Sequence, residues 1–490
     1  MPNILNLSIK NSPIKVAIFL AFLIGVLFRI YNLNYDYLWF DEILTFWVSD
    51  PNLLISESYA RCKETESTPF FYYFLLKVCH QLFGYTPEVG RYFSAIFGIL
   101  SILTLGYLAK QISNNKSFLL VIYLTSLNIF LISYSQEMRV YIFTFFLSTL
   151  NLIFFYKLIN NIEKRNFLYL ILFCFFQILN IYSFPFTLII FLSIIAYTIY
   201  QYIFFKKRYY EINISIIVVS IFLIFFIPYY LSASELYVGW IMQPDIKFYT
   251  NFYFSKFFGS RLMGIVHLSL LIYLILKFKK TIFTKDSKKL VLLFIIFLSY
   301  FLPLTYGYIF SPVIFPRYII FVLIPIILLI SILIFEIKNK LIKNFLIIII
   351  VFLNLGNHYS EATFKQFIDK RNFFKPDFKS MINLIYQSPE KNFTLDLSLS
   401  ATQPDLTFLW EKNINNAISS YIERESQDIN SEIKFINKKQ FINSNKNTVW
   451  VVCLTTVTKN KCEDLDLSSN MKRLKTQYFS GIKLELIEKQ

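Results

Sequence analysis

Two adjacent carboxylates, Asp41 and Glu42, follow the first long apolar run of the chain, in the stretch "YLWFDEILTFW" of residues 37–47. Aromatic side chains flank the pair on both sides. A carboxylate can take a proton from an acceptor hydroxyl, or orient an amine while it attacks a carbon atom. An isolated Asp-Glu pair also occurs in solvated loops and at helix N-termini, so the elements around it decide which interpretation holds.

Arginines occur near the ends of several apolar runs. A cation at membrane depth costs a few kcal/mol unless it is paired, so ionisable groups there usually have a function. Guanidinium groups bind phosphate in a bidentate manner. Any single arginine could snorkel or form a structural pair, but five that converge would make a cationic pocket for a phosphate or pyrophosphate. They are Arg29, Arg91, Arg139, Arg261 and Arg317.

Two of these arginines, Arg139 and Arg317, have polar neighbours near the ends of predicted spans. Proline fits the first turn of a helix, and a helix N-terminus adds positive potential. Pro316 precedes Arg317 in this way, so an anion is favoured there. The polar neighbours are Gln136 and Glu137 in "YSQEMRVY" (134–141), and Tyr318 in "SPVIFPRYIIF" (311–321).

The composition indicates a membrane protein. Of the 490 residues, 56% are hydrophobic, and the mean hydropathy is +0.52. Long apolar stretches indicate membrane spans. The net charge of +17 could suggest nucleic acid, but basic residues recur in the short loops between apolar runs, as is typical of a membrane protein, so no nucleic-acid partner is expected.

We expect an all-α polytopic membrane protein with about eleven spans, because each of these runs can cross roughly 30 Å of hydrocarbon. The stretch 166–205 is about twice the length of a span and breaks at Ser183-Phe184-Pro185, so we count it as two helices. The expected spans are 15–32, 91–109, 117–135, 139–157, 166–183, 185–205, 212–231, 261–277, 290–308, 313–335 and 341–357.

The loop charges orient these spans, because lysine and arginine are retained on the cytoplasmic side. One alternating set of loops is basic, which places the N-terminus inside the cell. The segment with Asp41 and Glu42 and everything after about residue 358 are then outside. The basic loops carry Lys10 and Lys15; Lys110 and Lys116; Lys157, Lys164 and Arg165; Lys206, Lys207 and Arg208; Lys277, Lys279, Lys280, Lys285, Lys288 and Lys289; and Lys338, Lys340 and Lys343.

The stretch 69–83, "PFFYYFLLKVCHQLF", is too short to span comfortably and contains Lys77 and His80. If it were a span, every later loop would change sides and the charge pattern would break. We therefore expect an amphipathic helix on the outer membrane surface.

The tail, residues 358–490, is polar and predicts a small extracytoplasmic α/β domain. Residues 393–400, 448–455 and 481–488 have the pattern of strands, and residues 376–387 that of a helix. The remainder, 1–357, forms the transmembrane module, and 33–90 is its first extracytoplasmic loop, with interfacial helices.

The cysteines and histidines have no metal-ligand spacing, so we expect no metal and no cofactor. The histidines, His80, His267 and His358, lie far apart in the sequence. Cys453 and Cys462 flank a short loop in the predicted external domain, where oxidation is permitted. The pattern leaves open whether they form a disulfide or remain free thiols.

Several motifs resemble, in their order and spacing, the GT-C membrane glycosyltransferases that use polyprenyl-phosphate sugars. The nearest branch contains the protein O-mannosyltransferases and the aminoarabinose transferases of lipid A. The resemblance covers roughly residues 15–335. Its motifs are "WFDE" (39–42), "ESTPFFYYFLLKVCHQLFGYTPEVGRYFSAIFG" (66–98), "SQEMRVY" (135–141), "FPRY" (315–318) and "GWIMQP" (239–244).

The resemblance implies an inverting transfer of a sugar from a lipid phosphate. It implies that Asp41 is the general base and Glu42 its partner. It also implies that Arg139 and Arg317, with Arg91, bind the donor phosphate. Gln136, Glu137, Tyr318 and Glu66 are candidate substrate contacts.

Two positions depart from the family pattern. Many relatives have a histidine where "NIYSFPF" (180–186) has Phe184, and "ESTPFF" has one proline where relatives often have two. These departures leave the acceptor open among lipid, glycan and protein.

A lipid-linked oligosaccharide flippase or another transporter is the alternative. It should carry charges along a path through the membrane and have internal repeats. In this sequence the arginines gather at one interface and no repeat is evident. We therefore expect an enzyme of a bacterial inner membrane, with membrane lipids, a polyprenyl-phosphate-linked sugar and an acceptor as its partners.

Overall fold

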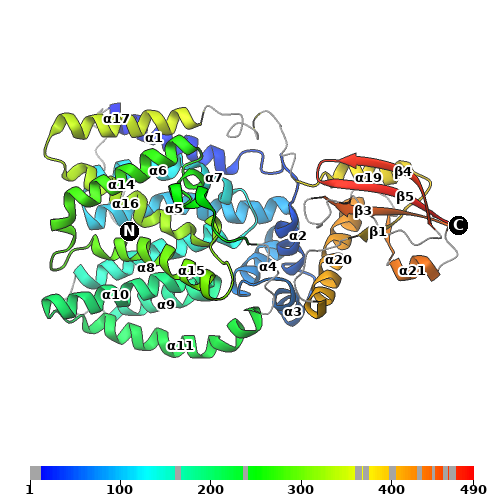
Figure 1. Cartoon of the computed structure of the whole chain (residues 1–490), viewed down its shortest axis with the longest axis horizontal. Coiled ribbons are helices and arrows are strands. Elements are labelled where there is room, and N and C mark those ends of the chain that lie inside the picture. The colour runs from blue at the N-terminus through cyan, green and yellow to red at the C-terminus, as the bar shows by residue number, and fades with distance from the viewer. Residues whose placement is uncertain are drawn as a thin grey trace. The chain divides into compact units, whose positions relative to one another are not determined.

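The computed structural model divides the chain into two compact units, a helical unit and a mixed unit (Figure 1). The helical unit comprises residues 1–31, 91–228 and 241–364, and the mixed unit comprises residues 32–90, 229–240 and 365–490. The structure describes residues 13–160, 167–234, 241–358, 367, 375–396, 404–427, 433–436, 438–443, 447–455, 462 and 471–490. Residues 239–240 of the "GWIMQP" motif, residues 397–400 of a predicted strand, and Lys10, Lys164 and Arg165 lie outside this part.

Long apolar helices build the helical unit, because the apolar runs of the sequence are long enough to form them. Helices α5 and α11 continue into the mixed unit at one end. The elements are α1 (Pro13–Ile30), α5 (Pro87–Ile112), α6 (Asn115–Ser126), α7 (Ile129–Ser135), α8 (Val140–Asn160), α9 (Phe167–Ser183), η1 (Pro185–Thr187), α10 (Leu188–Phe205), α11 (Tyr210–Ser234), α12 (Ile246–Asn251), α13 (Phe254–Phe257), α14 (Arg261–Ile282), α15 (Leu290–Ile309), η2 (Pro316–Val322), α16 (Leu323–Glu336) and α17 (Lys340–Asn357).

The expectation of a polytopic helical membrane protein is confirmed. Eight described helices are long and apolar enough to cross a membrane, and α6 with α7, bent by 59°, would make a ninth. Two further apolar helices, Val16–Ile30 and Phe167–Ser183, are shorter. The described part of every expected span is mainly helical, while the count of eleven stays a prediction.

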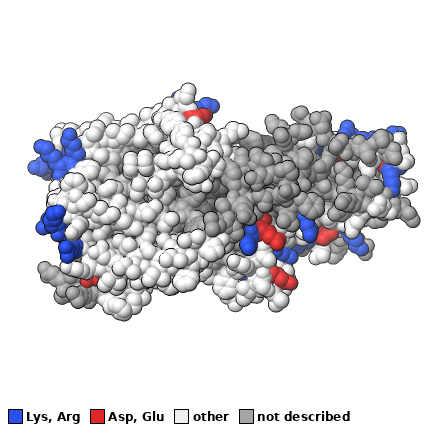
Figure 2. All heavy atoms as spheres, turned by 60° about the horizontal axis from the view of Figure 1, so that its bottom comes forward, with Lys and Arg blue, Asp and Glu red and all other residues white. Residues whose placement is uncertain are grey.

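Basic loops that follow α10, α14 and α16 lie at one end of the helical unit (Figure 1). The connections from α10 to α11, from α14 to α15 and from α16 to α17 come together there (Figure 1). Lysine and arginine side chains gather at that end, and the helix surface next to it is largely uncharged (Figure 2). This distribution is typical of a membrane protein whose basic loops share one side.

The core of the helical unit is α16, which is buried along nearly its whole length. Its sequence, "LIPIILLISILIFE", is apolar on all faces, as expected for a helix surrounded by other helices. Neutral buried side chains of α8 and α9 form hydrogen bonds with each other and with the main chain. Asn180 Nδ2 donates to Ser148 Oγ at 3.0 Å, and Asn151 Nδ2 to the carbonyl of Phe173 at 3.3 Å.

Three helices from the first loop and the C-terminal segment form the mixed unit together. The elements are α2 (Phe40–Val48), α3 (Ile55–Thr65), α4 (Phe71–Phe83), α19 (Phe378–Gln387), β1 (Asn392–Asp396), α20 (Pro404–Gln427), β2 (Lys434–Phe435), α21 (Lys438–Asn443), β3 (Thr448–Leu454), β4 (Met471–Phe479) and β5 (Ile482–Lys489). Helix α20 contacts α2 and α3, so the first loop and the tail share one core.

Side chains of α20 show how this shared core is made. Arg424 lies over the ring of Tyr85 at 4.1 Å and over that of Phe46 at 5.3 Å. The rings of Phe46 and Tyr85 stack with centroids 3.9 Å apart. Asn413 Nδ2 donates to Glu64 Oε2 at 3.0 Å. Aromatic burial and cation–π contacts together join the two segments.

The sheet confirms the predicted α/β character of the tail. Its strand order is β2-β1-β3-β5-β4, with β1 parallel to β2 and β3, and β5 antiparallel to β3 and β4. The register pairs Phe393 with Trp450 and Val452 with Leu484. Helix α19 contacts β5 and α20. At the edge, β4 is largely exposed and basic, which hinders pairing with another chain.

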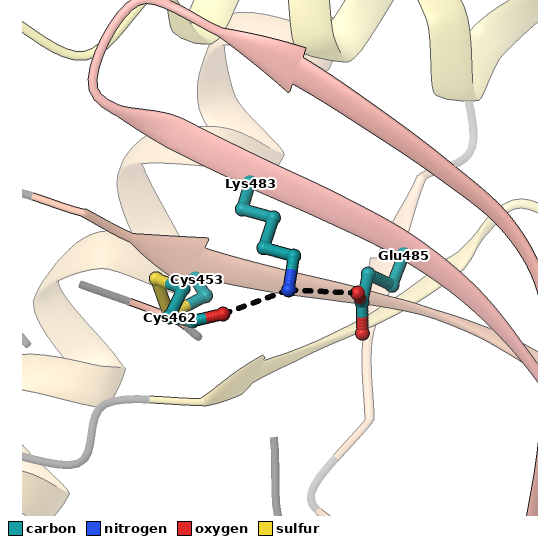
Figure 3. The surroundings of a disulfide bond; sticks show 4 residues. All are labelled: Cys453, Cys462, Lys483 and Glu485. Atoms are coloured by element: carbon teal, nitrogen blue, oxygen red, sulfur yellow. Dashed lines mark hydrogen bonds and ion pairs between the residues drawn. A yellow bond between two sulfur atoms is a disulfide. The ribbon is translucent and has the colours of Figure 1, made fainter. Parts of the chain in front are cut away.

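Cys453 and Cys462 form a disulfide, which resolves the alternative left open by the sequence (Figure 3). Beside it, Lys483 Nζ donates to the carbonyl of Cys462 at 2.7 Å and lies 3.0 Å from Glu485 Oε1. Both side chains are buried, so the ion pair compensates charges that would otherwise be costly.

The stretch 69–83 forms α4, as expected, but its polar face is buried in the mixed unit. Lys77 Nζ donates to the carbonyls of Asp50 and Leu53, the latter at 2.7 Å. His80 Nδ1 lies 3.2 Å from Ser49 Oγ. Main-chain and hydroxyl partners therefore accommodate the two polar residues that the sequence assigned to an exposed face.

Candidate active site

The predicted site residues fall into two clusters, one in each unit. The arginine cluster, in the helical unit, consists of Arg139 and Arg317 with the aromatic residues Tyr141, Tyr318 and Phe184. The acid cluster, in the mixed unit, consists of Asp36, Asp41, Glu42 and Lys375.

Tyr141 is common to both arginines. The Cζ atoms of Arg139 and Arg317 lie 5.9 Å and 5.5 Å from the centroid of its ring. All three side chains are buried. Arg139 directly precedes α8, and Arg317 lies in η2 after Pro316, so two helix starts bring the cations to one ring.

Aromatic rings surround this arrangement. Arg317 Cζ also lies 5.2 Å from the ring of Phe315 and 5.6 Å from that of Tyr318. Phe184 contacts Tyr141 at 5.7 Å and Tyr318 at 5.9 Å between centroids. Aromatic faces stabilise a guanidinium through its flat face, whereas phosphate binds at its edge. The two interactions are compatible, and anion binding by the arginine cluster stays a prediction.

Phe184 stands at the position where the resemblance implies a histidine in many relatives. Its ring is buried and packs next to Tyr141 and Tyr318, so this chain has an apolar aromatic surface at that point.

The other polar candidates of the helical unit have different surroundings. Gln136 Nε2 donates to the carbonyl of Phe28, which ties the turn after α7 to α1. Glu137 is half-buried, and its carbonyl accepts from the backbone N–H of Arg139 at 2.8 Å. Arg91 is buried near the start of α5. Their roles as donor contacts stay predictions.

Arg29 and Arg261 do not fit the expectation that five arginines converge. Arg29 Nη1 donates to the carbonyls of Gly25 and Ser126, both at 2.8 Å, and Nη2 donates to that of Thr125 at 3.0 Å. Arg29 therefore caps the last turn of α6 and joins it to α1. Arg261 is exposed at the start of α14.

The acid pair opens α2. Asp41 and Glu42 lie in the first turn, where the helix dipole favours negative charge. Glu42 is fully buried, and its Oε2 accepts from the backbone N–H of Trp39 at 3.5 Å. Asp41 is partly exposed. Glu42 is thus positioned to support the helix start, and Asp41 is the more exposed of the two carboxylates; its role as a base stays a prediction.

Two residues of the acid cluster were not selected from the sequence. Lys375 Nζ lies 3.4 Å from Asp36 Oδ2 and 3.7 Å from Glu42 Oε2. Asp36 precedes the acid pair by only five residues and could have been recognised as a third carboxylate in the same loop. Lys375 comes from the distant tail, and no motif marks it.

Glu66 lies at the C-terminal end of α3 and is buried. The adjacent turn is fixed by Thr68, whose Oγ1 lies 2.6 Å from the hydroxyl of Tyr73. The carbonyl of Thr68 accepts from the hydroxyl of Tyr229 at 2.7 Å. The "ESTPFFYY" motif therefore forms a tightly hydrogen-bonded turn, and substrate contact by Glu66 stays a prediction.

Comparison with known proteins gives similarity in structure alone. No protein-family model matches the sequence, and no curated protein matches it. ArnT from Cupriavidus metallidurans is similar in its apo state, with a TM-score of 0.63 and 10% identity over 97% of this chain and 98% of that one. Its structure bound to undecaprenyl phosphate gives a TM-score of 0.60, with 10% identity over 96% of this chain and 98% of that one.

A second similar structure is that of the archaeal oligosaccharyltransferase AglB from Archaeoglobus fulgidus, in complex with an inhibitory peptide and a dolichol-phosphate. It has a TM-score of 0.51 and 12% identity over 91% of this chain and 70% of that one. The similarity to ArnT extends over both units, including the C-terminal segment that the motifs do not cover. The chain therefore has the fold of the GT-C membrane glycosyltransferases, as its motifs predicted.

Proposed function

We propose that this chain is a glycosyltransferase that moves a sugar from a polyprenyl-phosphate donor to an acceptor at the extracytoplasmic face of a bacterial inner membrane. The transfer inverts the anomeric carbon and uses no metal ion. The acceptor is a lipid, glycan or protein. The observation that carries the proposal is the pair of buried guanidiniums of Arg139 and Arg317 beside Tyr141, in a fold shared with ArnT.

The donor phosphate is the proposed ligand of the arginine cluster. ArnT has been crystallised with undecaprenyl phosphate, which supports a lipid phosphate as the ligand in this fold. Cleavage of the bond between the sugar and the phosphate oxygen turns a phosphodiester into a phosphomonoester and so adds negative charge to the phosphate. Arg139 and Arg317, with Arg91, would stabilise this charge more strongly in the transition state than in the bound donor.

The acid cluster supplies the base in this proposal. Asp41 accepts the proton of the acceptor hydroxyl or amine while that group attacks the anomeric carbon, and the electron pair of the broken bond stays on the phosphate oxygen. Glu42, buried beside Lys375, supports the helix start that carries Asp41.

The flippase alternative needs ionisable groups along a path through the membrane. The four helices α8, α9, α10 and α16 argue against such a path, because their only charged residues are Lys157 and Glu336, both near helix ends. The buried polar residues between α8 and α9 are neutral amides and hydroxyls. Transfer at one interface is favoured over transport.

Binding of undecaprenyl phosphate to the purified protein tests the proposal. We expect Arg139→Gln and Arg317→Gln each to weaken binding about tenfold or more, the loss expected for a charge-assisted hydrogen bond. Arg261→Gln is the matched control, because Arg261 also begins a helix but is exposed. Equal affinity of all three variants and the unmodified protein would contradict the proposal.

A further inference from the structure

Lys375 connects the C-terminal segment to the acids of the first loop. Its ammonium lies within 4.0 Å of two carboxylates, those of Asp36 and Glu42, at 3.4 Å and 3.7 Å. The side chains of Asp36 and Glu42 are 5% and 0% exposed, and that of Lys375 is 16% exposed. The three groups therefore interact where water screens little of their charge.

The β4–β5 turn holds the backbone of Lys375. Ser480 Oγ donates to the carbonyl of Lys375 at 3.0 Å, and the backbone N–H of Asp377 donates to the carbonyl of Ser480 at 2.8 Å. Gly481, the next residue, has φ +65° and no side chain. A Cβ atom there would lie 3.0 Å from Pro376 Cα, which is tighter than ordinary packing, so glycine favours this close approach both by its size and by its φ angle.

The two buried carboxylates of Asp36 and Glu42 need a cation beside them. Two carboxylates in a buried region repel each other and lose hydration. A single ammonium between them compensates part of this cost and restricts the rotamers of both side chains. Glu42 is the direct neighbour of Asp41 in the first turn of α2, so a fixed Glu42 also fixes the start of the helix that presents Asp41.

We propose that Lys375 is a positioning residue of the active site, held by the β4–β5 turn and acting on Asp41 through Glu42. This inference rests on the proposed function of Asp41 and Glu42. In this proposal the C-terminal sheet contributes to catalysis, because its turn at Ser480 and Gly481 positions the ammonium group of Lys375. Lys375 itself touches no reacting atom in this account.

The test is turnover of purified full-length protein in nanodiscs, with undecaprenyl-phosphate sugars offered in turn and a cell-envelope extract as acceptor. Release of undecaprenyl phosphate is measured per amount of folded protein. We expect Lys375→Met to lower kcat about 10- to 100-fold, as for other residues that orient a catalytic group, and to leave the KM for the donor unchanged. Lys375→Arg should restore most of the rate, because it keeps the cation.

Two further variants separate positioning from a merely structural effect. Lys379→Met is the matched control, since Lys379 is an exposed lysine four residues away on α19. It should turn over at the unmodified rate. Gly481→Ala leaves every charge in place but displaces the backbone at Lys375 and Pro376. It should lower kcat in the same direction as Lys375→Met.

The outcomes distinguish this inference from the proposed function. Unchanged kcat in Lys375→Met, or equal losses in Lys375→Met and Lys379→Met, would overturn the positioning role alone. If the unmodified protein releases undecaprenyl phosphate from none of the donors, the proposed function fails, and this inference fails with it. A low rate in Lys375→Met that is recovered in Lys375→Arg supports both the proposed function and the positioning role of Lys375.

Discussion

The guanidinium of Arg317 lies 5.5 Å from the centroid of the Tyr141 ring, and both side chains are buried. The same ring lies 5.9 Å from the guanidinium of Arg139. One aromatic ring is therefore shared by two cations that lie at the starts of two different helices. In the proposed reaction, the shared ring keeps both cations beside the same phosphate group.

Replacement of Tyr141 tests this relationship. We expect Tyr141→Phe to bind undecaprenyl phosphate nearly as well as the unmodified protein, because the ring face is retained. Tyr141→Leu removes the ring and should weaken binding by about 1–2 kcal/mol, the size of a buried cation–π contact. Isothermal titration in detergent gives both values. Equal binding by the two variants would show that the ring does not organise the arginines.

Arg29 should matter for stability and not for donor binding. Arg29→Met removes the donors to three carbonyls, those of Gly25, Thr125 and Ser126. We expect the protein to lose about 3 kcal/mol or more of unfolding free energy, because buried carbonyls without donors are costly. Thermal unfolding measures the loss, with the exposed Arg261→Met as control. If Arg29→Met is as stable as the control but binds undecaprenyl phosphate more weakly, the prediction is wrong, and Arg29 contributes to donor binding.

His80 predicts a pH dependence of stability. Burial lowers the pKa of His80 from its ordinary value of 6.5 to about 4. Between these values the unfolded chain binds a proton that the folded chain does not, so stability is full above pH 6.5 and falls as the pH drops to 4. The loss from this group is at most about 3–4 kcal/mol, because each pKa unit corresponds to about 1.36 kcal/mol.

Unfolding of the full-length protein at pH 7 and pH 5 tests the His80 prediction. His80→Gln cannot take up a proton, so its stability should fall less over this interval than that of the unmodified protein. The comparison isolates His80 from carboxylates that titrate in the same range. Identical pH dependence in both proteins would contradict the prediction.

The disulfide between Cys453 and Cys462 should stabilise the mixed unit. It closes a short loop, with a sequence separation of 9, and such a loop contributes about 3 kcal/mol. We expect dithiothreitol to lower the unfolding temperature of the unmodified protein but to leave that of Cys453→Ser/Cys462→Ser unchanged. If the double variant responds equally to dithiothreitol, the stabilisation has another origin.

The sequence predicted the elements whose physics is local. The apolar runs specify the helices, and the alternation in 448–455 and 481–488 corresponds to β3 and β5. The helix expected at 376–387 is α19, Phe378–Gln387. Strand β4 was missed, because the exposed edge "MKRLKTQYF" lacks an apolar face. Its pairing with β5 depends on a partner that no local pattern reveals.

The site was predictable only in part, because the sequence does not show which distant residues the fold brings together. Arg139, Arg317 and the acid pair stand out because charge is expensive near apolar runs. Arg29 stands out equally, yet its partners are main-chain carbonyls about a hundred residues away in sequence, which the sequence does not display. Lys375 is a single lysine in a basic tail, and only the fold brings it to Asp36 and Glu42.

The most direct test of the account is sugar transfer by Asp41→Asn. Purified protein is loaded with an undecaprenyl-phosphate sugar, and transfer to the acceptor is followed in a single turnover, with donor binding measured in parallel. Loss of the general base should slow transfer about 100- to 10,000-fold while donor binding stays unchanged. Transfer by Asp41→Asn at the rate of the unmodified protein would contradict the account.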